Sequence, residues 1–456
     1  MNNLERSLAP FLILSALFAA AGPAPRLPDG MRDAPVSALD SLRGGDGGSK
    51  PLAVSAPAPV VGSGEDAGAG DDAGSGGTAS SGEKEWTVLV FLNAKNDLEK
   101  YGMGDMNQME QVGSGRHYNV VVQLGRSPGY DASDGNWSGV RRYYMTRDRD
   151  ASRITSPVLE DLGALDMGDY RVLVDFVNWG KLRYPAEKYL LIVWNHGAGW
   201  PGISFDDDTG GYMTTPQLAQ ALRQTGGVDV VATDACLMQM AEVAYELKDF
   251  AKYIVGSEET IPGKGYAYHK ILRRLRLNAR RGAESMGAML TRTYGQSMLA
   301  EEGATLSSLD ASQLPGLANL MDAFARAAMA SGDEVKNALR EARDEAYAYD
   351  ESNFKDLARF MKAAEKKLEQ GELKTLARRI HRHITRELVD ARRRNLFAYD
   401  RDAETGEKEN YRLDLSNKSK GVSAYIPDSS VSWKYSQLAF ARDTQWDEFL
   451  AWLLRA

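Results

Sequence analysis

The sequence predicts an α/β protein with a mostly parallel central β-sheet and a helix-rich C-terminal portion. Short apolar runs alternate with segments of helical apolar spacing from residue 86 to about residue 257. Strands that alternate with helices form βαβ units, and helices then cover both faces of the sheet. Helical spacing dominates from about residue 283 to residue 394.

The first predicted strand, 86–92, is almost continuously apolar, which is typical of a strand buried on both faces. The other strands are shorter apolar or β-branched runs, and the helices repeat apolar residues every three or four positions. We predict strands at 86–92, 118–124, 139–145 (with antiparallel pairing as an alternative to parallel), 189–194, 228–232, 253–257 and 421–427. We predict helices at 98–112, 170–179, 217–224, 237–247 and 446–454.

The N-terminal residues 1–22 are predicted to be a signal peptide or an N-terminal anchor. Residues 11–21 are apolar apart from Ser15, a length typical of a signal-peptide core and short for a membrane span. A short buried helix is the alternative. The protein is therefore expected to be secreted or held in the cell envelope, of bacterial type, with membrane contact only through this segment if it stays uncleaved.

Residues 23–84 are predicted to be a disordered linker, because Gly, Ala, Ser and Asp cannot bury enough apolar surface to offset the entropy of ordering. A regulatory propeptide is the alternative. The folded part is expected to comprise a catalytic core, 85–282, and a helix-rich region, 283–456, that completes the fold.

The composition of the chain excludes some classes of function. At 456 residues the net charge is −8 at pH 7, whereas a nucleic-acid-binding protein needs a basic face. The single cysteine, Cys236, excludes a disulfide within the chain.

Cys236 and His196 are the candidate catalytic residues. Each follows a predicted buried strand, 228–232 and 189–194, and ligands of parallel sheets bind beyond the carboxyl ends of the strands. Cys236 is expected at the start of the helix 237–247, where the helix dipole would stabilise a thiolate. His196 would transfer the proton. A buried, inert cysteine is the alternative.

Two neighbours of this pair have predicted roles of their own. The backbone N–H groups of Gly197 and Cys236 would form an oxyanion hole. Asp234, two residues before the cysteine, would either bind an arginine side chain or cap the bend into the helix, and the residues leave both open.

Several strings in the sequence resemble the clostripain-like cysteine peptidases. They are residues 86–99, Trp194-Asn195-His196-Gly197, Asp234-Ala235-Cys236-Leu237-Met238, residues 242–246, 257–259 and 262–266, and residues 421–427. The resemblance implies a caspase-like α/β/α sandwich. It also implies a His196/Cys236 dyad that cleaves protein or peptide substrates after Arg or Lys, with Asp234 in the pocket for the basic side chain.

The chain departs from this family in one respect. Related peptidases are often activated by self-cleavage after a basic residue between the histidine and the cysteine, but here the interval 197–235 holds only Arg223, inside a predicted helix. We therefore predict no self-processing there. The chain would act uncut or be activated elsewhere, for instance at Arg43, Lys50 or Lys84.

No cofactor is expected to be required, although calcium is possible. Asp206, Asp207 and Asp208 are candidate ligands for this oxygen-preferring cation, but their spacing is not that of an EF-hand loop. A solvated loop is the alternative. The function predicted overall is that of a cysteine endopeptidase; the alternatives are a non-catalytic peptide-binding relative and a peptidase with another side-chain preference.

Overall fold

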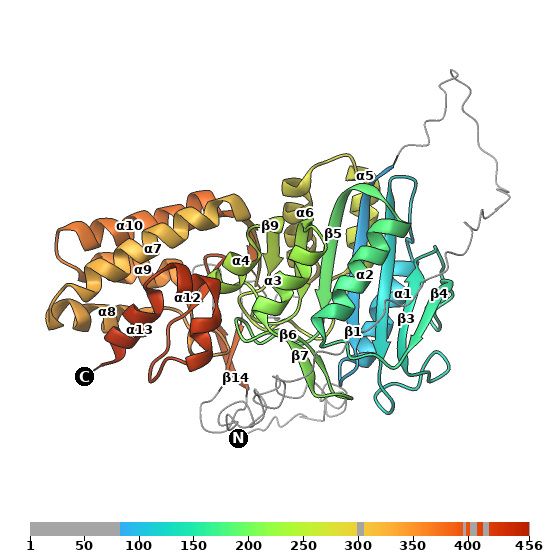
Figure 1. The fold of residues 1–456 in the computed structure, drawn as a ribbon, viewed down its shortest axis with the longest axis horizontal. Helices are drawn as coiled ribbons and strands as arrows, with labels where there is room; N and C mark the ends of the chain where they lie inside the picture. The colour runs from blue at the N-terminus through green and yellow to red at the C-terminus, as the bar shows by residue number, and fades with distance from the viewer. Residues whose placement is uncertain (1–82, 299–304, 395–397, 402–407, 414–418, 456) are drawn as a thin grey trace, which may run out of the picture. The chain divides into compact units, whose positions relative to one another are not determined.

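The computed structural model describes residues 83–298, 305–394, 398–401, 408–413 and 419–455 (Figure 1). The predicted signal segment 1–22 and nearly all of the predicted linker 23–84 lie outside these residues. Within the described ranges, no helix combines the length and the apolar character needed to cross a membrane.

One large sheet forms the centre of the fold. Its strands in chain order are β1 (Lys84–Ala94), β2 (Tyr118–Arg126), β3 (Gly139–Tyr144), β4 (Val158–Gly163), β5 (Ala186–Trp194), β8 (Val228–Asp234), β9 (Ala251–Gly256), β10 (Thr305–Asp310) and β12 (Val389–Arg394). Their order across the sheet is β12-β10-β9-β8-β5-β1-β2-β3-β4. The five strands from β9 to β2 run parallel, and two antiparallel strands extend the sheet at each side.

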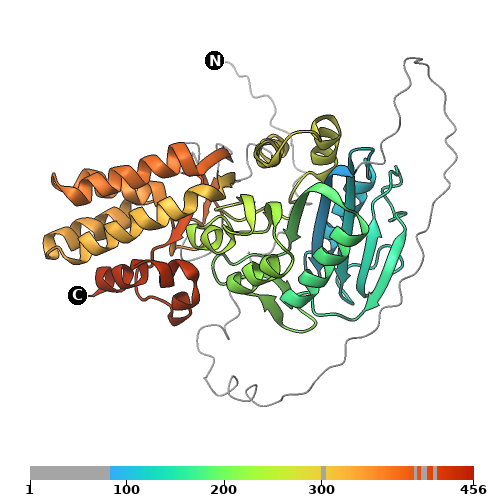
Figure 2. The same ribbon diagram turned by 45° about the horizontal axis from the view of Figure 1, so that its top comes forward.

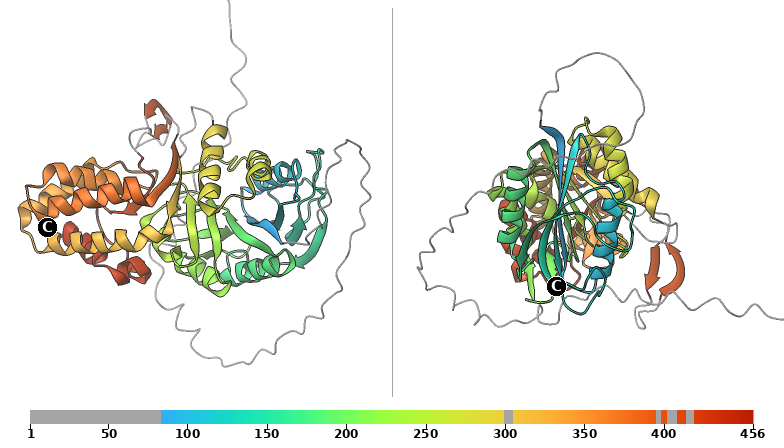
Figure 3. Two further views of the ribbon diagram at one scale, coloured as in Figure 1. Left: turned by 90° about the horizontal axis from the view of Figure 1, so that it is seen from above. Right: turned by 90° about the vertical axis from the view of Figure 1, so that its right-hand side faces the viewer.

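Helices cover both faces of this sheet (Figure 3). One face carries α1 (Glu99–Glu110), α5 (Tyr268–Asn278) and α6 (Ala283–Ser297); the other carries α2 (Tyr170–Arg183), α3 (Thr215–Gln224) and α4 (Ala241–Leu247). Strand residues alternate between the two cores: Leu89 and Phe91 of β1 lie in one, and Val90 and Leu92 lie in the other. The mostly parallel α/β/α architecture predicted from the apolar runs is confirmed.

The remaining helices lie beyond the β10–β12 side of the sheet (Figures 1 and 2). They are α7 (Leu314–Met329), α8 (Asp333–Glu345), α9 (Leu357–Lys367), α10 (Glu372–His383), α12 (Ala439–Asp443) and α13 (Trp446–Leu454). Aromatic contacts join them, since Phe449 of α13 packs against Phe324 of α7, and Trp446 packs against Phe360 of α9. Three two-stranded pairs complete the described elements: β6 (Ile203–Asp206) with β7 (Gly211–Met213), β11 (Phe354–Asp356) with β15 (Ser423–Tyr425), and β13 (Ala398–Arg401) with β14 (Lys408–Leu413).

Strands β10 and β12 differ from the sequence prediction. Both lie in the region predicted to be helix-rich, and they extend the sheet of the core past residue 282. Their sequences, TLSSLD and VDARRR, contain no continuous apolar run, although β10 is buried from Thr305 to Leu309. Strand β4 and helix α5 were also not predicted, and β15 pairs with β11 outside the large sheet.

Helix α4 is joined to the C-terminal segment through a buried carboxyl group. Glu242 Oε1 accepts hydrogen bonds from the Tyr425 N–H and from the Tyr435 hydroxyl, both at 2.8 Å. Burial raises the pKa of Glu242 from 4.5 to about 7, even though both hydrogen bonds favour the ionised form. The folded protein therefore holds this carboxyl protonated at pH values where the unfolded chain has lost the proton.

We predict that this carboxyl makes folding less favourable as the pH rises. A raised pKa in the folded state contributes stability that is fully present below about pH 4.5 and is lost as the pH rises through about 7, a change on the order of 3 kcal/mol. Glu242→Gln should remove this component, so its melting temperature should fall less than that of the wild type between pH 5 and pH 8. Glu334→Gln, at an exposed position of α8, is the control. Equal pH dependence in all three proteins would contradict the prediction.

Candidate active site

The candidate site lies at the carboxyl ends of β5 and β8. These strands are parallel neighbours, and Trp194, the last residue of β5, pairs with Asp234, the last residue of β8. His196 and Cys236 each lie two residues farther along the chain. The two loops are in close contact, because a Cβ atom on Gly197 would lie 2.4 Å from the Cys236 carbonyl oxygen. The structure thus brings these two predicted segments together.

Cys236 is half-buried beside the segment that follows β9. Its sulfur accepts the Ile261 N–H at 3.2 Å. Burial raises the pKa of the Cys236 thiol to about 11; the Ile261 N–H opposes this shift, and the charges of Glu259, Asp350 and Asp234 add to it. The thiol is therefore protonated at neutral pH and needs a proton acceptor before it can act as a nucleophile.

The prediction that Cys236 opens a helix is wrong. Helix α4 begins only at Ala241. Before it, the backbone is hydrogen-bonded to the segment that follows β9: the Leu237 N–H donates to the Glu259 carbonyl and the Gln239 N–H to the Ser257 carbonyl. Leu237 lies at φ +64°, a left-handed conformation that is costly for a branched side chain. A helix dipole therefore does not stabilise the thiolate, in accord with the raised pKa.

His196 has a partner that the sequence analysis did not identify. Its Nε2 atom lies 2.7 Å from Oδ1 of Asp97, which belongs to the turn between β1 and α1. This hydrogen bond is the main reason that the pKa of Asp97 is lowered. The imidazole is mostly buried, whereas 70% of the Asp97 side chain is exposed. A carboxylate on Nε2 favours the tautomer with the proton on that atom, which leaves Nδ1 as the free acceptor.

The backbone N–H groups predicted to form the oxyanion hole are available. Within the described part of the chain, neither the Gly197 nor the Cys236 N–H donates to a protein acceptor. Gly197 lies so close to the Cys236 carbonyl that a side chain at this position would clash. The glycine therefore permits the close approach of the two loops.

Asp234 is a buried carboxyl group with one unused oxygen. Its Oδ2 accepts the Tyr266 N–H and the Tyr268 hydroxyl, both at 3.0 Å, whereas Oδ1 has no hydrogen-bond partner among the described residues. Burial raises its pKa to about 7. The side chain does not cap α4, which begins seven residues later. Of the two roles left open by the sequence, the capping role is therefore wrong.

A second buried acid adds to the negative character of this region. Asp105 of α1 accepts the Trp194 indole N–H at 2.9 Å, and its pKa is raised by burial and by the charge of Asp234. No ion pair with Lys or Arg is found for either acid in the described ranges. Buried carboxyl groups without a counter-charge favour either a proton or an incoming cation.

The three candidate calcium ligands do not share one partner. Asp206 is buried and Asp208 is partly exposed, and both form ion pairs with Lys95; the Tyr130 hydroxyl donates to Asp207 at 2.6 Å. In the described part of the chain, no three His, Cys, Asp or Glu residues are grouped to hold a metal ion. The solvated-loop alternative does not describe Asp206, and calcium binding stays an untested prediction.

The interval from Gly197 to Ala235 contains the β6–β7 hairpin and α3. Its one basic residue, Arg223, lies in the last turn of α3, as the sequence predicted. The hairpin turn carries acidic and small residues only, from Asp206 to Gly211.

The sequence of this chain matches a known protein family over most of its length. A model of the clostripain family, peptidase C11, matches residues 90–452. Clostripain from Hathewaya histolytica is 27% identical over 220 residues, a match that spans 42% of this chain and 42% of clostripain.

Two solved structures share the fold. A secreted C11 cysteine protease from Bacteroides thetaiotaomicron, in complex with an irreversible peptide inhibitor, has a TM-score of 0.61 at 22% identity, covering 81% of this chain and 99% of that chain. An inactive zymogen C11 protease from Parabacteroides distasonis has a TM-score of 0.62 at 19% identity, covering 80% and 99%. At these identities the likeness supports the fold alone, which is caspase-like, as the motifs predicted. Because the family model spans most of the sequence, this chain belongs to the clostripain family.

Proposed function

We propose that the protein is a cysteine endopeptidase that cleaves protein or peptide chains after Arg or Lys. The observation that carries the proposal is the close packing of the two loops that follow the paired strands β5 and β8. These segments carry the Cys236 thiol, the His196 imidazole and the buried Asp234 carboxyl with its unused oxygen. Each supplies one requirement of the reaction: a nucleophile, a proton acceptor and a counter-charge for the substrate.

The reaction begins with transfer of the thiol proton to His196 as the sulfur attacks the carbonyl carbon of the scissile bond. The imidazolium that forms is stabilised by the Asp97 carboxylate at 2.7 Å, so Asp97 acts as a positioning residue. The tetrahedral oxyanion accepts the N–H groups of Gly197 and Cys236, each worth about 3 kcal/mol.

The intermediate collapses when His196 returns the proton to the leaving amine, which breaks the C–N bond and leaves a thioester on Cys236. Water then gives a proton to His196 and attacks the thioester carbonyl. The sulfur departs, recovers the proton, and the carboxylic acid product is released.

Asp234 provides the preference for a basic residue. A guanidinium or ammonium group entering beside Cys236 would meet Oδ1, and the nearby charge of Asp105 adds to the attraction. A neutral side chain would leave the carboxyl group uncompensated. Binding a basic side chain would therefore offset the free-energy cost of burying the Asp234 carboxylate, and binding a neutral side chain would not.

We also propose that the chain is exported. Residues 1–22 have the pattern of a signal peptide or anchor, and the Bacteroides thetaiotaomicron relative is described as secreted. Protein or peptide substrates outside the cytoplasm would then be the targets.

We expect Cys236→Ala to lower kcat for Arg- and Lys-terminated fluorogenic peptides by at least about 10³-fold, because the nucleophile is lost. His196→Ala should lose a similar factor, since the two residues act as a unit. Turnover by the wild type is measured alongside an Asp-terminated peptide, which should react poorly. Binding of peptides without turnover of any of them by the wild type would instead indicate a peptide-binding relative.

We expect Asp234→Asn to lower kcat/KM for an Arg substrate by about 10²-fold or more, because removing one partner of a buried charge pair costs about 2–5 kcal/mol. The matched citrulline substrate has the same shape without the charge and should be much less affected. In the wild type, kcat/KM for the Arg substrate should also fall below about pH 7 as Asp234 gains a proton. Asp249→Asn, on the exposed surface, is the control. An equal loss for both substrates would place Asp234 outside the pocket.

We expect Asp97→Asn to lower kcat by about 10-fold, less than loss of the base itself, because the exposed carboxylate is screened by water. KM for the Arg substrate should stay unchanged, since Asp97 contacts His196 and not the bound side chain. Asp97→Glu should recover part of the rate, and Asp333→Asn serves as the exposed control. A change in KM with kcat unaltered would rule out the positioning role.

A further inference from the structure

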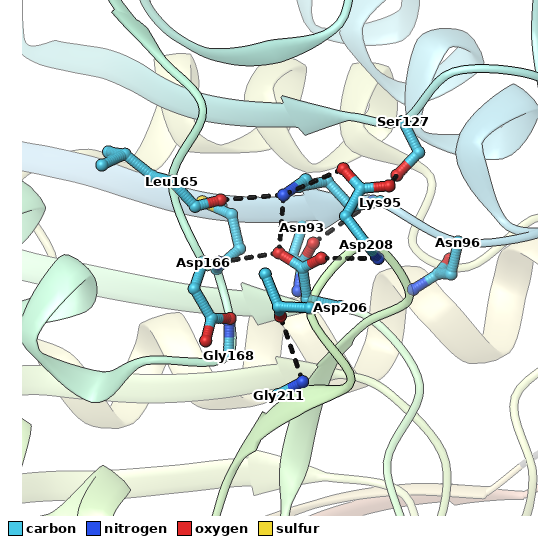
Figure 4. Close-up of polar contacts among 12 residues, drawn as sticks. Asn93, Lys95, Asn96, Ser127, Leu165, Asp166, Gly168, Asp206, Asp208 and Gly211 are labelled. Atoms are coloured by element: carbon cyan, nitrogen blue, oxygen red, sulfur yellow. Dashed lines mark hydrogen bonds and ion pairs between the residues drawn. The ribbon is translucent and has the colours of Figure 1, made fainter.

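Lys95, just after β1, holds a buried ammonium group in a cage of oxygen atoms (Figure 4). Its Nζ atom lies 2.8 Å from the Leu165 carbonyl oxygen, 2.9 Å from Asp206 Oδ2 and 3.1 Å from Asp208 Oδ2. Only 3% of the Lys95 side chain is exposed. The segment of Leu165 and the loop that holds Asp206 and Asp208 thus converge on one positive charge.

The two carboxyl groups of the cage, those of Asp206 and Asp208, accept several further hydrogen bonds that stabilise a negative charge. The Asp206 side chain is fully buried, and besides Lys95 it accepts the Met167 N–H at 2.9 Å and the Asp208 N–H at 3.0 Å. Asp208 accepts the Ser127 hydroxyl at 2.8 Å. The backbone donors and the Lys95 ammonium together offset the cost of burying the Asp206 carboxylate.

The same loop is tied to the ends of β1 and β5. The Phe205 carbonyl oxygen accepts three side-chain amides, from Asn93 and Asn96 at 3.1 Å and from Asn195 at 3.0 Å. Asn195 in turn accepts the Phe205 N–H at 2.7 Å. The loop is therefore hydrogen-bonded directly to Asn195, the residue that precedes His196.

Lys95 also stands close in sequence to the partner of the histidine. Asp97 follows it by two residues, and the Lys95 carbonyl oxygen accepts the Asp207 N–H at 2.9 Å. The backbone and the ammonium of one residue thus fix the acidic loop to the turn that carries Asp97. Movement of this loop would displace Asp97 and His196 relative to each other.

We propose that the Lys95 ammonium is a tethered cation that orders the loop 203–208 and so positions the Asp97–His196 pair, in the role that a bound divalent metal would otherwise fill. A divalent ion such as calcium prefers the same carboxylate and carbonyl oxygens. Lys95 places its ammonium group among these oxygens. Because this group is covalently linked to the backbone, it cannot diffuse away as a bound metal ion can. The wild-type site is therefore ordered without added metal.

The test compares wild type, Lys95→Ala and Lys95→Met in the full chain. Lys95→Ala leaves space for a small cation, whereas Lys95→Met fills the space with an apolar stem. We expect the wild type to keep its activity and melting temperature in excess EGTA. Lys95→Ala should lose about 10²-fold in kcat, as expected for a misplacement of about 1 Å in the catalytic pair. Propylammonium chloride or calcium chloride should restore much of this loss.

The controls separate a cation from a general salt effect. Tetramethylammonium chloride, which has no N–H donor, should not restore Lys95→Ala, and no salt should restore Lys95→Met. Lys252→Ala, which removes an exposed ammonium, should resemble the wild type. The melting temperature is measured for every combination, so the test also works if the protein hydrolyses none of the peptides tried.

Three results would overturn the proposal. The first is a wild type that loses activity or stability in EGTA and recovers it with calcium. The second is a Lys95→Ala variant with wild-type kcat and melting temperature. The third is a Lys95→Ala variant that neither propylammonium nor calcium improves. Its kcat and melting temperature would stay unchanged if it folds, and it would stay unfolded in both salts if it does not.

Discussion

The parallel pairing of β5 with β8 is the constraint on which the site depends. This register sets Trp194 opposite Asp234, and the two loops that follow then meet with Gly197 against the Cys236 carbonyl. A shift of one residue would turn the Asp234 side chain to the other face of the sheet, because side chains alternate along a strand. The pairing of β1 with β5 adds Asp97 to the same edge.

Three acidic residues near this edge, Asp206, Asp97 and Asp234, differ in what stabilises their negative charge. Asp206 is compensated by a lysine of the same chain, whereas Asp97 is largely exposed and its pKa is lowered mainly by the hydrogen bond to His196. Asp234 has no counter-charge in the described structure, so its carboxyl group is left to bind a proton or a basic side chain. Asp234 lies two residues before Cys236, where the basic side chain of the proposed substrate would supply the missing charge.

Burial also raises the pKa of the Cys236 thiol, the proposed nucleophile. The environment that disfavours the Cys236 thiolate also strengthens any ion pair that forms there, since the effective dielectric constant is low. A thiol of this kind is inert until a base is correctly placed. Under the proposed mechanism, the position of His196, and hence of the loop and turn that hold it, determines whether the Cys236 thiol can react.

The sequence by itself determined the α/β class, the strands at 86–92, 189–194 and 228–232, and the placement of His196 and Cys236 after two of them. It did so because continuous apolar runs are a local signal of buried strands. It misplaced the start of α4, since the apolar spacing after Cys236 does not reveal that Leu237 and Gln239 bond sideways to Glu259 and Ser257.

Only the tertiary structure decided which strands are neighbours, and with that the partners of each side chain. Asp97 becomes the partner of His196 because β1 lies beside β5, and Asp234 binds Tyr266 and Tyr268 rather than a helix end because α5 packs on that face. Strands β10 and β12 join the sheet with few apolar residues, even though β10 is buried from Thr305 to Leu309. Periodicity is a property of adjacent residues, whereas strand order is settled by the packing of segments far apart in the chain.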